Sequence, residues 1–209
     1  MIESLIEMDR AASLAINGLH TGWADSMMMF LSSHTVWIPL YVLTAVLMFI
    51  PKWYGPDSEA GRLRDSGRKV PFWTIALTGI IMTVLCFAFT DYFTNVIKET
   101  VQRPRPGHDH ILSGLLHLPA GRGGQFGFFS GHASNTFGFA LITSLIFRKK
   151  WYTWIIMAWS VAIGFSRIYL GMHFVTDVLC GMAFGTVIAT IFWLLYRFII
   201  NALLFRREH

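Results

Sequence analysis

Two long runs of apolar residues constrain the fold of this chain more than any other feature. Residues 27–50 and 72–97 are each long enough to cross a hydrocarbon core of ~30 Å, for which about 20 helical residues suffice. Backbone polar groups cannot stay unsatisfied in that core, so both runs predict membrane-spanning helices. The composition agrees, because 54% of the residues are hydrophobic and only 14% are charged. We therefore expect an integral membrane protein.

Three further apolar runs complete the expected bundle. Residues 133–147 and 151–165 are shorter and are separated by only a few basic residues, so we interpret them as a helical hairpin of two spans. The last span covers about 174–200, and its Gly181 and Gly185 are spaced to let another helix approach closely. The prediction is an all-α integral membrane helical bundle with about five transmembrane helices.

The amino-terminal segment predicts a different kind of helix. Residues 1–20 place apolar side chains among acids and an arginine, which is typical of an amphipathic helix that lies at the membrane interface. The segment lacks the basic start and long apolar core of a signal peptide. The sequence shows no internal repeat, low-complexity tract or second domain. We therefore expect a single domain over residues 1–209.

The distribution of lysine and arginine predicts the orientation of the bundle. Positively charged loops favour the cytoplasmic side. The basic clusters are Lys52, Arg62, Arg64, Arg68 and Lys69, then Arg148, Lys149 and Lys150, then Arg206 and Arg207. The connections 98–132 and 166–173 should then face outward, together with the amino-terminal helix. We expect a multi-pass protein of a bacterial-type inner membrane whose chemistry faces the periplasm or the outside.

Net charge and cysteines exclude two other classes of protein. The net charge of +5 could suggest nucleic-acid binding, but the basic residues lie in short clusters between apolar runs, as in cytoplasmic loops. Cys86 and Cys180 both fall inside apolar segments, so we interpret them as small buried hydrophobic side chains. We expect no nucleic-acid partner, no disulfide and no obligatory protein partner.

Three polar clusters lie in the connections that should face outward. They are KETVQRPRP (98–106), FFSGHAS (128–134) and SRIYLGMHFVTD (166–177). Ionisable side chains near a bilayer are costly unless they are paired, hydrated or functional, so each is a candidate site residue. The candidates are Lys98, Arg105, Ser130, Gly131, His132, Arg167, His173 and Asp177.

The histidines and the aspartate of these clusters suit nucleophilic catalysis. His173 and Asp177 are four residues apart at a helix start, hence on one face. The carboxylate can accept a hydrogen bond from one ring nitrogen of His173 and leave the other free to attack phosphorus. His132 can protonate the departing oxygen and later activate water, because an imidazole titrates near neutrality.

The remaining candidates suit phosphate binding. Attack on phosphorus builds negative charge on the oxygens, and Lys98, Arg105 and Arg167 supply three cations to meet it. Ser130 is a good N-cap residue, and the free N–H groups that follow it would form an anion site at a helix start. Gly131 lets the phosphate approach closely. A single histidine and aspartate at helical spacing more often form a structural hydrogen bond than a catalytic pair, but the three clusters together favour catalysis.

These three stretches, in this order and at these spacings, resemble the signature of the type-2 phosphatidic acid phosphatase superfamily. That superfamily includes integral membrane lipid phosphatases, soluble acid phosphatases and vanadium haloperoxidases. The resemblance covers residues 70–197 closely and implies the same roles at the same positions. Membrane members commonly have proline before Ser-Gly-His, where this chain has Phe129. Proline contributes no catalytic group, so we expect activity to be kept.

Other ionisable residues have simpler interpretations. Asp91 lies on about the same helix face as Lys98 and could orient that lysine or bond a neighbouring helix. We interpret Arg103 as a solvated charge rather than a ligand of a distal phosphate or headgroup. The histidines flanking Asp109 form a lone His-x-His in a polar loop, so we expect no metal and no cofactor. Three histidines have no partner that the sequence identifies: His20, His34 and His117.

The sequence leaves three functions to compare. A metal-independent lipid phosphatase or diphosphatase, acting on an outer-leaflet lipid through a phosphohistidine, is favoured because all the catalytic residue types are present. The alternative is a catalytically silent lipid transporter or scramblase of the same fold. A vanadate-dependent oxidase is disfavoured by the five spans. Undecaprenyl diphosphate and lipid A are the favoured substrates, followed by phosphatidylglycerol phosphate and phosphatidic acid.

Overall fold

The described part of the chain is helical, as the sequence predicts. A computed structural model describes residues 2–65 and 71–205, and within them it contains no strand. Three short 3₁₀ turns connect the helices: η1 (Thr35–Trp37), η2 (Pro51–Trp53) and η3 (Pro106–His108). The α-helices are α1 (Ile2–Asn17), α2 (Gly22–Ser32), α3 (Ile38–Leu47), α4 (Glu59–Asp65), α5 (Phe72–Val101), α6 (Gly131–Phe147), α7 (Lys150–Tyr169) and α8 (Val175–Phe205).

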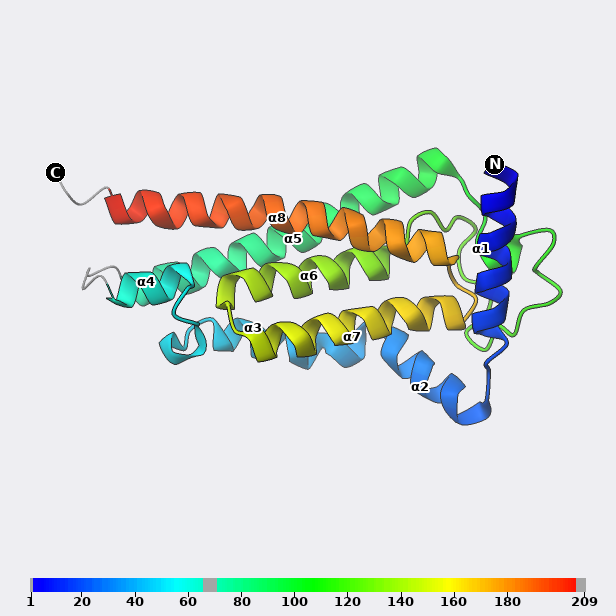
Figure 1. The fold of residues 1–209 in the computed structure, drawn as a ribbon, viewed down its shortest axis with the longest axis horizontal. Helices are drawn as coiled ribbons and strands as arrows, with labels where there is room; N and C mark the ends of the chain where they lie inside the picture. The colour runs from blue at the N-terminus through cyan, green and yellow to red at the C-terminus, as the bar shows by residue number, and fades with distance from the viewer. Residues whose placement is uncertain (1, 66–70, 206–209) are drawn as a thin grey trace.

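Helices α5 to α8 run along the long axis of the molecule, and α1 crosses one end of them (Figure 1). Helix α6 is the centre of the bundle, because α5, α7 and α8 all pack against it. The two glycines of α8 permit this close approach. A β-carbon at Gly181 would lie 2.6 Å from the Ser130 carbonyl oxygen, and one at Gly185 would lie 3.0 Å from the Gly138 nitrogen. The predicted role of these glycines is confirmed.

The structure supports some of the predicted spans more strongly than others. Among the described residues, α5 and α8 are long and apolar enough to cross a membrane, and the bent α2–α3 pair adds a third span if it is counted as one. Helices α6 and α7 form the predicted hairpin around Arg148, whose φ is 52°. Neither reaches the length and composition of a span, so five spans stay a prediction.

The first predicted span, 27–50, is wrong as one continuous helix. Helix α2 ends at Ser32, and the chain bends by 65° before α3 begins. Polar Ser-Ser-His residues interrupt the apolar run at this point, and serine side chains compete with helical backbone hydrogen bonds. Ser33 and Thr35 bond each other there, with 3.2 Å between their hydroxyl oxygens. The break turns polar groups toward the end of the bundle that α1 crosses.

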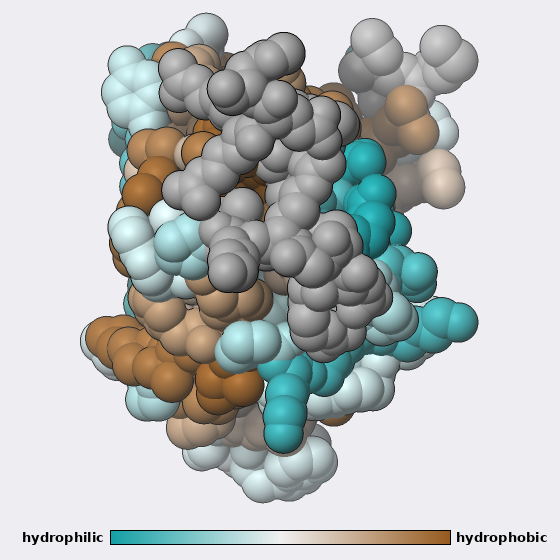
Figure 2. Space-filling view, turned by 90° about the vertical axis from the view of Figure 1, so that its left-hand side faces the viewer, coloured by the Kyte–Doolittle hydropathy of each residue, from teal (hydrophilic) through white to brown (hydrophobic). Residues whose placement is uncertain are grey.

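The described loops that we predict to be cytoplasmic lie at the opposite end. The loop after α3 reaches the α6–α7 turn, where the Gly55 nitrogen donates to the Phe147 carbonyl at 2.7 Å. Arg197 of α8 pairs with buried Glu59 of α4 at 2.8 Å. Figure 2 looks onto this end and shows a band of hydrophilic side chains beside apolar ones. Four of the predicted cytoplasmic residues lie outside the described residues: Arg68, Lys69, Arg206 and Arg207.

The apolar core lies at the basic end and in the middle of the bundle. Aromatic rings of Tyr54, Phe147 and Tyr152 pack edge to face there, which is a favoured geometry for aromatic pairs. Cys86 is buried in this core as predicted, but Cys180 is exposed on α8. The expectation that both cysteines are buried is therefore wrong for Cys180. Both cysteines are free.

Candidate active site

A tight turn between α7 and α8 carries His173. Gly171 has φ +65°, a conformation that L side chains rarely adopt, and a β-carbon there would meet the side chain of Leu118. After this turn, the backbone nitrogens of Met172 and His173 donate to the Arg167 carbonyl at 3.0 and 3.2 Å. The turn therefore fixes His173 beside the last turn of α7. Its ring is buried, with 1% of the residue exposed.

His173 and Asp177 face each other, as their spacing predicts. Nδ1 of His173 lies 3.6 Å from Oδ2 of Asp177, and Asp177 is fully buried. The same oxygen accepts a hydrogen bond from the Phe174 nitrogen at 3.0 Å, which closes the first turn of α8. The separation is too long for the predicted hydrogen bond, and Nδ1 has no hydrogen-bond partner among the described residues. Asp177 nevertheless lies on the Nδ1 side of the ring, which leaves Nε2 as the nitrogen for attack.

The three predicted cations surround this histidine. Burial, and then the positive charges of Arg167, Arg105 and Lys98, hold the pKa of His173 well below its ordinary value. The imidazole is therefore neutral near pH 7. A neutral ring has the lone pair that nucleophilic attack requires, whereas an imidazolium does not. The same cations that lower this pKa would stabilise negative charge on a bound phosphate.

Arg105 is held by a glycine-rich loop that crosses the end of the bundle. Its Nε donates to the Phe126 carbonyl at 3.1 Å, and its backbone nitrogen donates to the Gln125 carbonyl at 3.0 Å. A β-carbon at Gly123 would lie 2.7 Å from the guanidinium, and one at Gly127 would lie 3.1 Å from Oδ2 of Asp177. Glycines therefore let the loop pass close to both charged groups.

The amino terminus of α6 forms another wall of the site. Ser130 is the N-cap residue, and its hydroxyl accepts a hydrogen bond from the Ala133 nitrogen at 3.4 Å. Its own nitrogen donates to the Asp177 carbonyl at 2.9 Å, which joins α6 to α8. A β-carbon at Gly131 would lie 3.4 Å from Nζ of Lys98. The lysine thus lies directly against the predicted anion site at the helix start.

His132 contacts a segment that sequence reasoning did not place in the site. Its Nε2 lies 3.1 Å from the carbonyl oxygen of Ser32, at the break between α2 and α3. The ring of His34 packs against it at a tilt of 37°, with 3.9 Å between the ring centroids. Arg167 also contacts the Ser32 hydroxyl. The broken span therefore contributes one wall of the site, and the signal for it is the Ser-Ser-His interruption of an apolar run.

All eight predicted site residues thus lie at one end of the bundle, around His173. Phe129, which replaces the usual proline, is buried and packs its ring 4.9 Å from that of Phe184 on α8. The contact of Phe129 with α8 therefore fixes the chain just before α6, at the position where a proline would stiffen the backbone.

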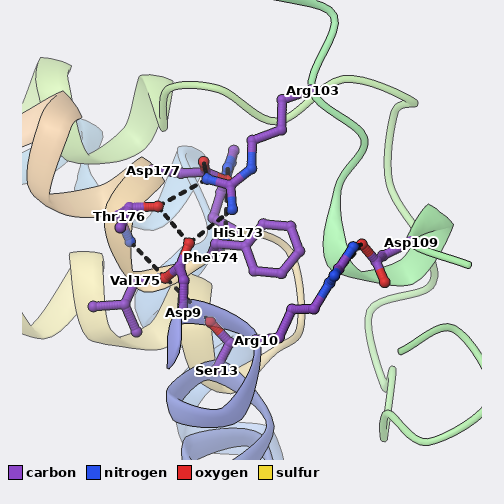
Figure 3. A network of polar contacts seen from close by, with 10 residues as sticks. All are labelled: Asp9, Arg10, Ser13, Arg103, Asp109, His173, Phe174, Val175, Thr176 and Asp177. Atoms are coloured by element: carbon purple, nitrogen blue, oxygen red, sulfur yellow. Dashed lines mark hydrogen bonds and ion pairs between the residues drawn. The ribbon is translucent and has the colours of Figure 1, made fainter. Parts of the chain in front are cut away.

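The interpretation of Arg103 as a solvated charge is wrong. Its guanidinium pairs with Asp177 and with Asp9 of α1, both at 2.7 Å, and lies over the Phe174 ring with 4.1 Å to the centroid (Figure 3). Local spacing cannot predict this pairing, because Asp9 lies 94 residues from Arg103.

Of the two interpretations of Asp91, the structure favours the bond to a neighbouring helix. Asp91 accepts a hydrogen bond from the Asn135 amide of α6 at 3.0 Å.

The remaining histidines have partners that the sequence did not identify. His117 pairs with Asp25 at 2.8 Å, and its ring stacks on that of His20 at 4.2 Å. Asp109 pairs with Arg10 rather than with its neighbouring histidines. Within the described residues, no group of three or more histidine, cysteine or acidic side chains is placed to hold a metal ion.

The geometry defines a class of protein: a helical membrane bundle with a buried, neutral histidine among cations that suit a phosphate. Residues 73–200 match the profile of the PAP2 superfamily, and the chain belongs to that superfamily. The resemblance in the three motifs is therefore confirmed. The individual roles of the site residues stay predictions.

Three relatives illustrate the likeness. The lipid A 4'-phosphatase of Bacteroides thetaiotaomicron is 30% identical over 188 residues, which is 88% of this chain and 75% of that protein. The lipid A 4'-phosphatase of Porphyromonas gingivalis is 29% identical over 197 residues, or 93% and 75% of the two chains. A crystal structure of a PAP2-type phosphatidylglycerolphosphate phosphatase from Bacillus subtilis superimposes with a TM-score of 0.65. That pair is 22% identical, covers 99% of this chain and 90% of that one, and shows the shared fold.

Proposed function

We propose that this protein is a membrane lipid phosphatase that removes phosphate from a phosphorylated lipid through a phosphohistidine. The observation that carries the proposal is the buried His173, which lies 3.6 Å from Asp177 and has the charges of Arg167, Arg105 and Lys98 close enough to lower its pKa. Arg105 and Arg167 each make a side-chain contact with another segment, to the Phe126 carbonyl and the Ser32 hydroxyl, and neither guanidinium forms an ion pair with a carboxylate of the described residues. A bound phosphate group would balance their charge and place phosphorus next to the ring.

The reaction consists of two displacements at phosphorus. Nε2 of His173 attacks, so that a nitrogen–phosphorus bond forms while the bond to the lipid oxygen breaks. Burial, and then the charge of Arg167, lower the pKa of His132 to about 2, so its ring is neutral before a phosphate binds, contrary to the predicted titration near neutrality. The negative charge of a bound phosphate raises this pKa, and His132, then protonated on Nδ1 as well as Nε2, gives the Nδ1 proton to the departing oxygen. Water then attacks the phosphohistidine, His132 takes the proton of that water, and inorganic phosphate leaves with His173 restored. Asp177 keeps its place on Nδ1 of His173 throughout, at the 3.6 Å separation seen in the structure.

Lipid A is the substrate that we favour, in the mono- or diphosphorylated form that a phosphatase of this kind would meet at the outer face of an inner membrane. Two relatives that each align with most of this chain carry the name lipid A 4'-phosphatase. The alternative of a silent transporter gains nothing from the structure, since His132, His173 and Asp177 are all present and lie at one end of the bundle.

A lipid panel tests the proposed function. Purified protein is given lipid A, undecaprenyl diphosphate, phosphatidylglycerol phosphate and phosphatidic acid in matched micelles, and inorganic phosphate is measured with a chelator present throughout. We expect release that the chelator does not reduce, fastest from lipid A, and none from the His173→Ala variant. No release from any lipid would overturn the phosphatase. Faster release from another lipid would overturn only the choice of lipid A.

The proposed orientation places the site outside and the basic end in the cytoplasm. In a background where Cys180 is replaced by alanine, because its thiol is exposed, single cysteines are introduced at exposed Leu115 and Asp57. A membrane-impermeant maleimide added to intact cells should label position 115 and spare position 57, which becomes labelled only after the membrane is opened. The reverse pattern would contradict the proposed periplasmic site.

A further inference from the structure

The fully buried side chains by which helix α1 docks onto the bundle are polar, and apolar Ile16 packs beside them only partly buried. Asp9, Ser13 and Asn17 are each buried, with exposed fractions of 6%, 2% and 1%, and their spacing of four puts them on one helix face. Apolar Leu5 and Met8, by contrast, are largely exposed. A helix that buries its polar stripe must satisfy every group of it with specific partners.

Those partners belong to the segment that carries the site. The first N–H groups of an α-helix have no partner within the helix, and here α1 supplies two of the missing acceptors for α8. The Ser13 hydroxyl accepts from the Val175 nitrogen at 3.2 Å, and Oδ1 of Asp9 accepts from the Thr176 nitrogen at 3.0 Å (Figure 3). Side chains of α1 therefore cap the amino terminus of α8, the helix that carries Asp177.

Arg103 connects the same stripe to Asp177 itself. Its NH2 group pairs with Oδ2 of Asp9, and its NH1 group pairs with Oδ1 of Asp177, each at 2.7 Å. NH1 also donates to the Thr176 hydroxyl at 2.8 Å. The planar fork of an arginine fits two carboxylates in this way, whereas the point charge of a lysine does not. Both arms of Arg103 are thus occupied, so it is not a free phosphate ligand.

The opposite oxygen of Asp177 is the one that faces His173. Since Oδ1 is held by Arg103 and Oδ2 by the Phe174 nitrogen, the carboxylate has one orientation, and that orientation presents Oδ2 to Nδ1. Asp177 is fully buried, and among the described residues Arg103 is the cation that forms an ion pair with it at hydrogen-bond distance. The orientation of the acid beside the nucleophile therefore depends on Arg103, and that of Arg103 depends on Asp9.

We propose that Asp9 and Arg103 are positioning residues for the reaction, and that α1 is thereby a working part of the site rather than only a membrane anchor. The proposal rests on the proposed function. Neither residue touches the phosphate; each acts through Asp177 on the ring of His173. Outer partners of this kind typically change activity by about 10- to 100-fold when they are lost.

The test compares Asp9→Asn with Arg10→Gln. Arg10 pairs with Asp109 at 2.8 Å and so docks the same helix without touching Asp177 or its partners. On p-nitrophenyl phosphate, which needs no membrane, we expect Asp9→Asn to lower kcat about 10- to 100-fold with KM within about twofold of the wild type. Arg10→Gln should keep kcat within about twofold, and Asp9→Glu should recover most of the loss.

Two further variants distinguish a loss of positioning from a folding defect. Arg103→Lys keeps the positive charge but cannot bridge two carboxylates, so its kcat should fall like that of Asp9→Asn. Thr176→Val removes one exposed hydroxyl shared by Asp9 and Arg103, and a smaller fall in kcat at unchanged melting temperature is expected. Full kcat in Asp9→Asn, or an equal fall in Arg10→Gln, would overturn the proposal. A wild type that releases no phosphate from any substrate would instead overturn the proposed function.

Discussion

Replacing His173 by alanine is expected to abolish turnover, with a loss of more than about 10⁴-fold, because removal of a nucleophile leaves only binding and electrostatic effects. The variant should also lose all trapped phosphoenzyme. Wild-type protein quenched during turnover of ³²P-labelled substrate should carry phosphate that is stable to base and labile to acid, as a nitrogen–phosphorus bond requires. The ring of His173 lies close to the three cations of the site, where a bound phosphate would be held.

The control for this result is a histidine at the same end of the molecule. His117 pairs with Asp25 and stacks on His20, away from the phosphate site, so His117→Ala should still trap phosphate. Asp177→Asn should trap it more slowly, because the tautomer of His173 is then set wrongly while the nucleophile remains. Trapped label in His173→Ala would show that another group attacks, and the assignment of the nucleophile would be wrong.

The predicted site residues were found because local chemistry identifies them. His173 and Asp177 are one helical turn apart, and Ser130 precedes a helix that it caps, so each relation is contained within a few residues. Lys98 and Arg105 required more, namely the order of three clusters on one side of a membrane. Short-range spacing and the positive-inside rule together predict that these groups share one end of the bundle.

The residues that were missed have partners far away in the sequence. Asp9 meets Thr176 at a separation of 167 residues, and Ser32 meets His132 at a separation of 100. No periodicity reports such a contact. Two local signals were nevertheless present: a polar residue at every fourth position of α1, and a Ser-Ser-His interruption of an apolar run. The first indicates a helix that docks by its polar face, and the second indicates a break.

The fold was predictable to the extent that hydrophobic length determines it. Helices α5 and α8 are long and apolar, so their spans follow from composition alone. The bend between α2 and α3 does not, because the apolar residues on both sides of Ser32 still read as one run of sufficient length. Cys180 was misplaced for a related reason. A span has a protein-facing and a lipid-facing side, and apolar residues occupy both, so hydropathy cannot say which cysteine is buried.

The role of His132 can be separated from that of its neighbour His34. A carbonyl oxygen only accepts hydrogen bonds, so Nε2 of His132 carries the proton that points to Ser32, and Nδ1 is the nitrogen left to exchange protons with the leaving group. The ring of His34 contacts that of His132 at a tilt. Removing His132 should therefore remove a general acid, whereas removing His34 should remove only a ring contact.

His132→Ala is expected to slow the first displacement by about 10²- to 10⁴-fold with a poor alkoxide leaving group, and by much less with p-nitrophenol, which needs little protonation to depart. The burst of leaving group under rapid mixing is the measurement, because hydrolysis of the phosphoenzyme also stays slow for want of a base. His34→Ala, the matched control, should alter both substrates by the same small factor. If His132→Ala slows the burst equally with both leaving groups, His132 does not protonate the leaving oxygen. If His34→Ala shows the strong dependence instead, the acid is His34, and the broken span supplies a catalytic group.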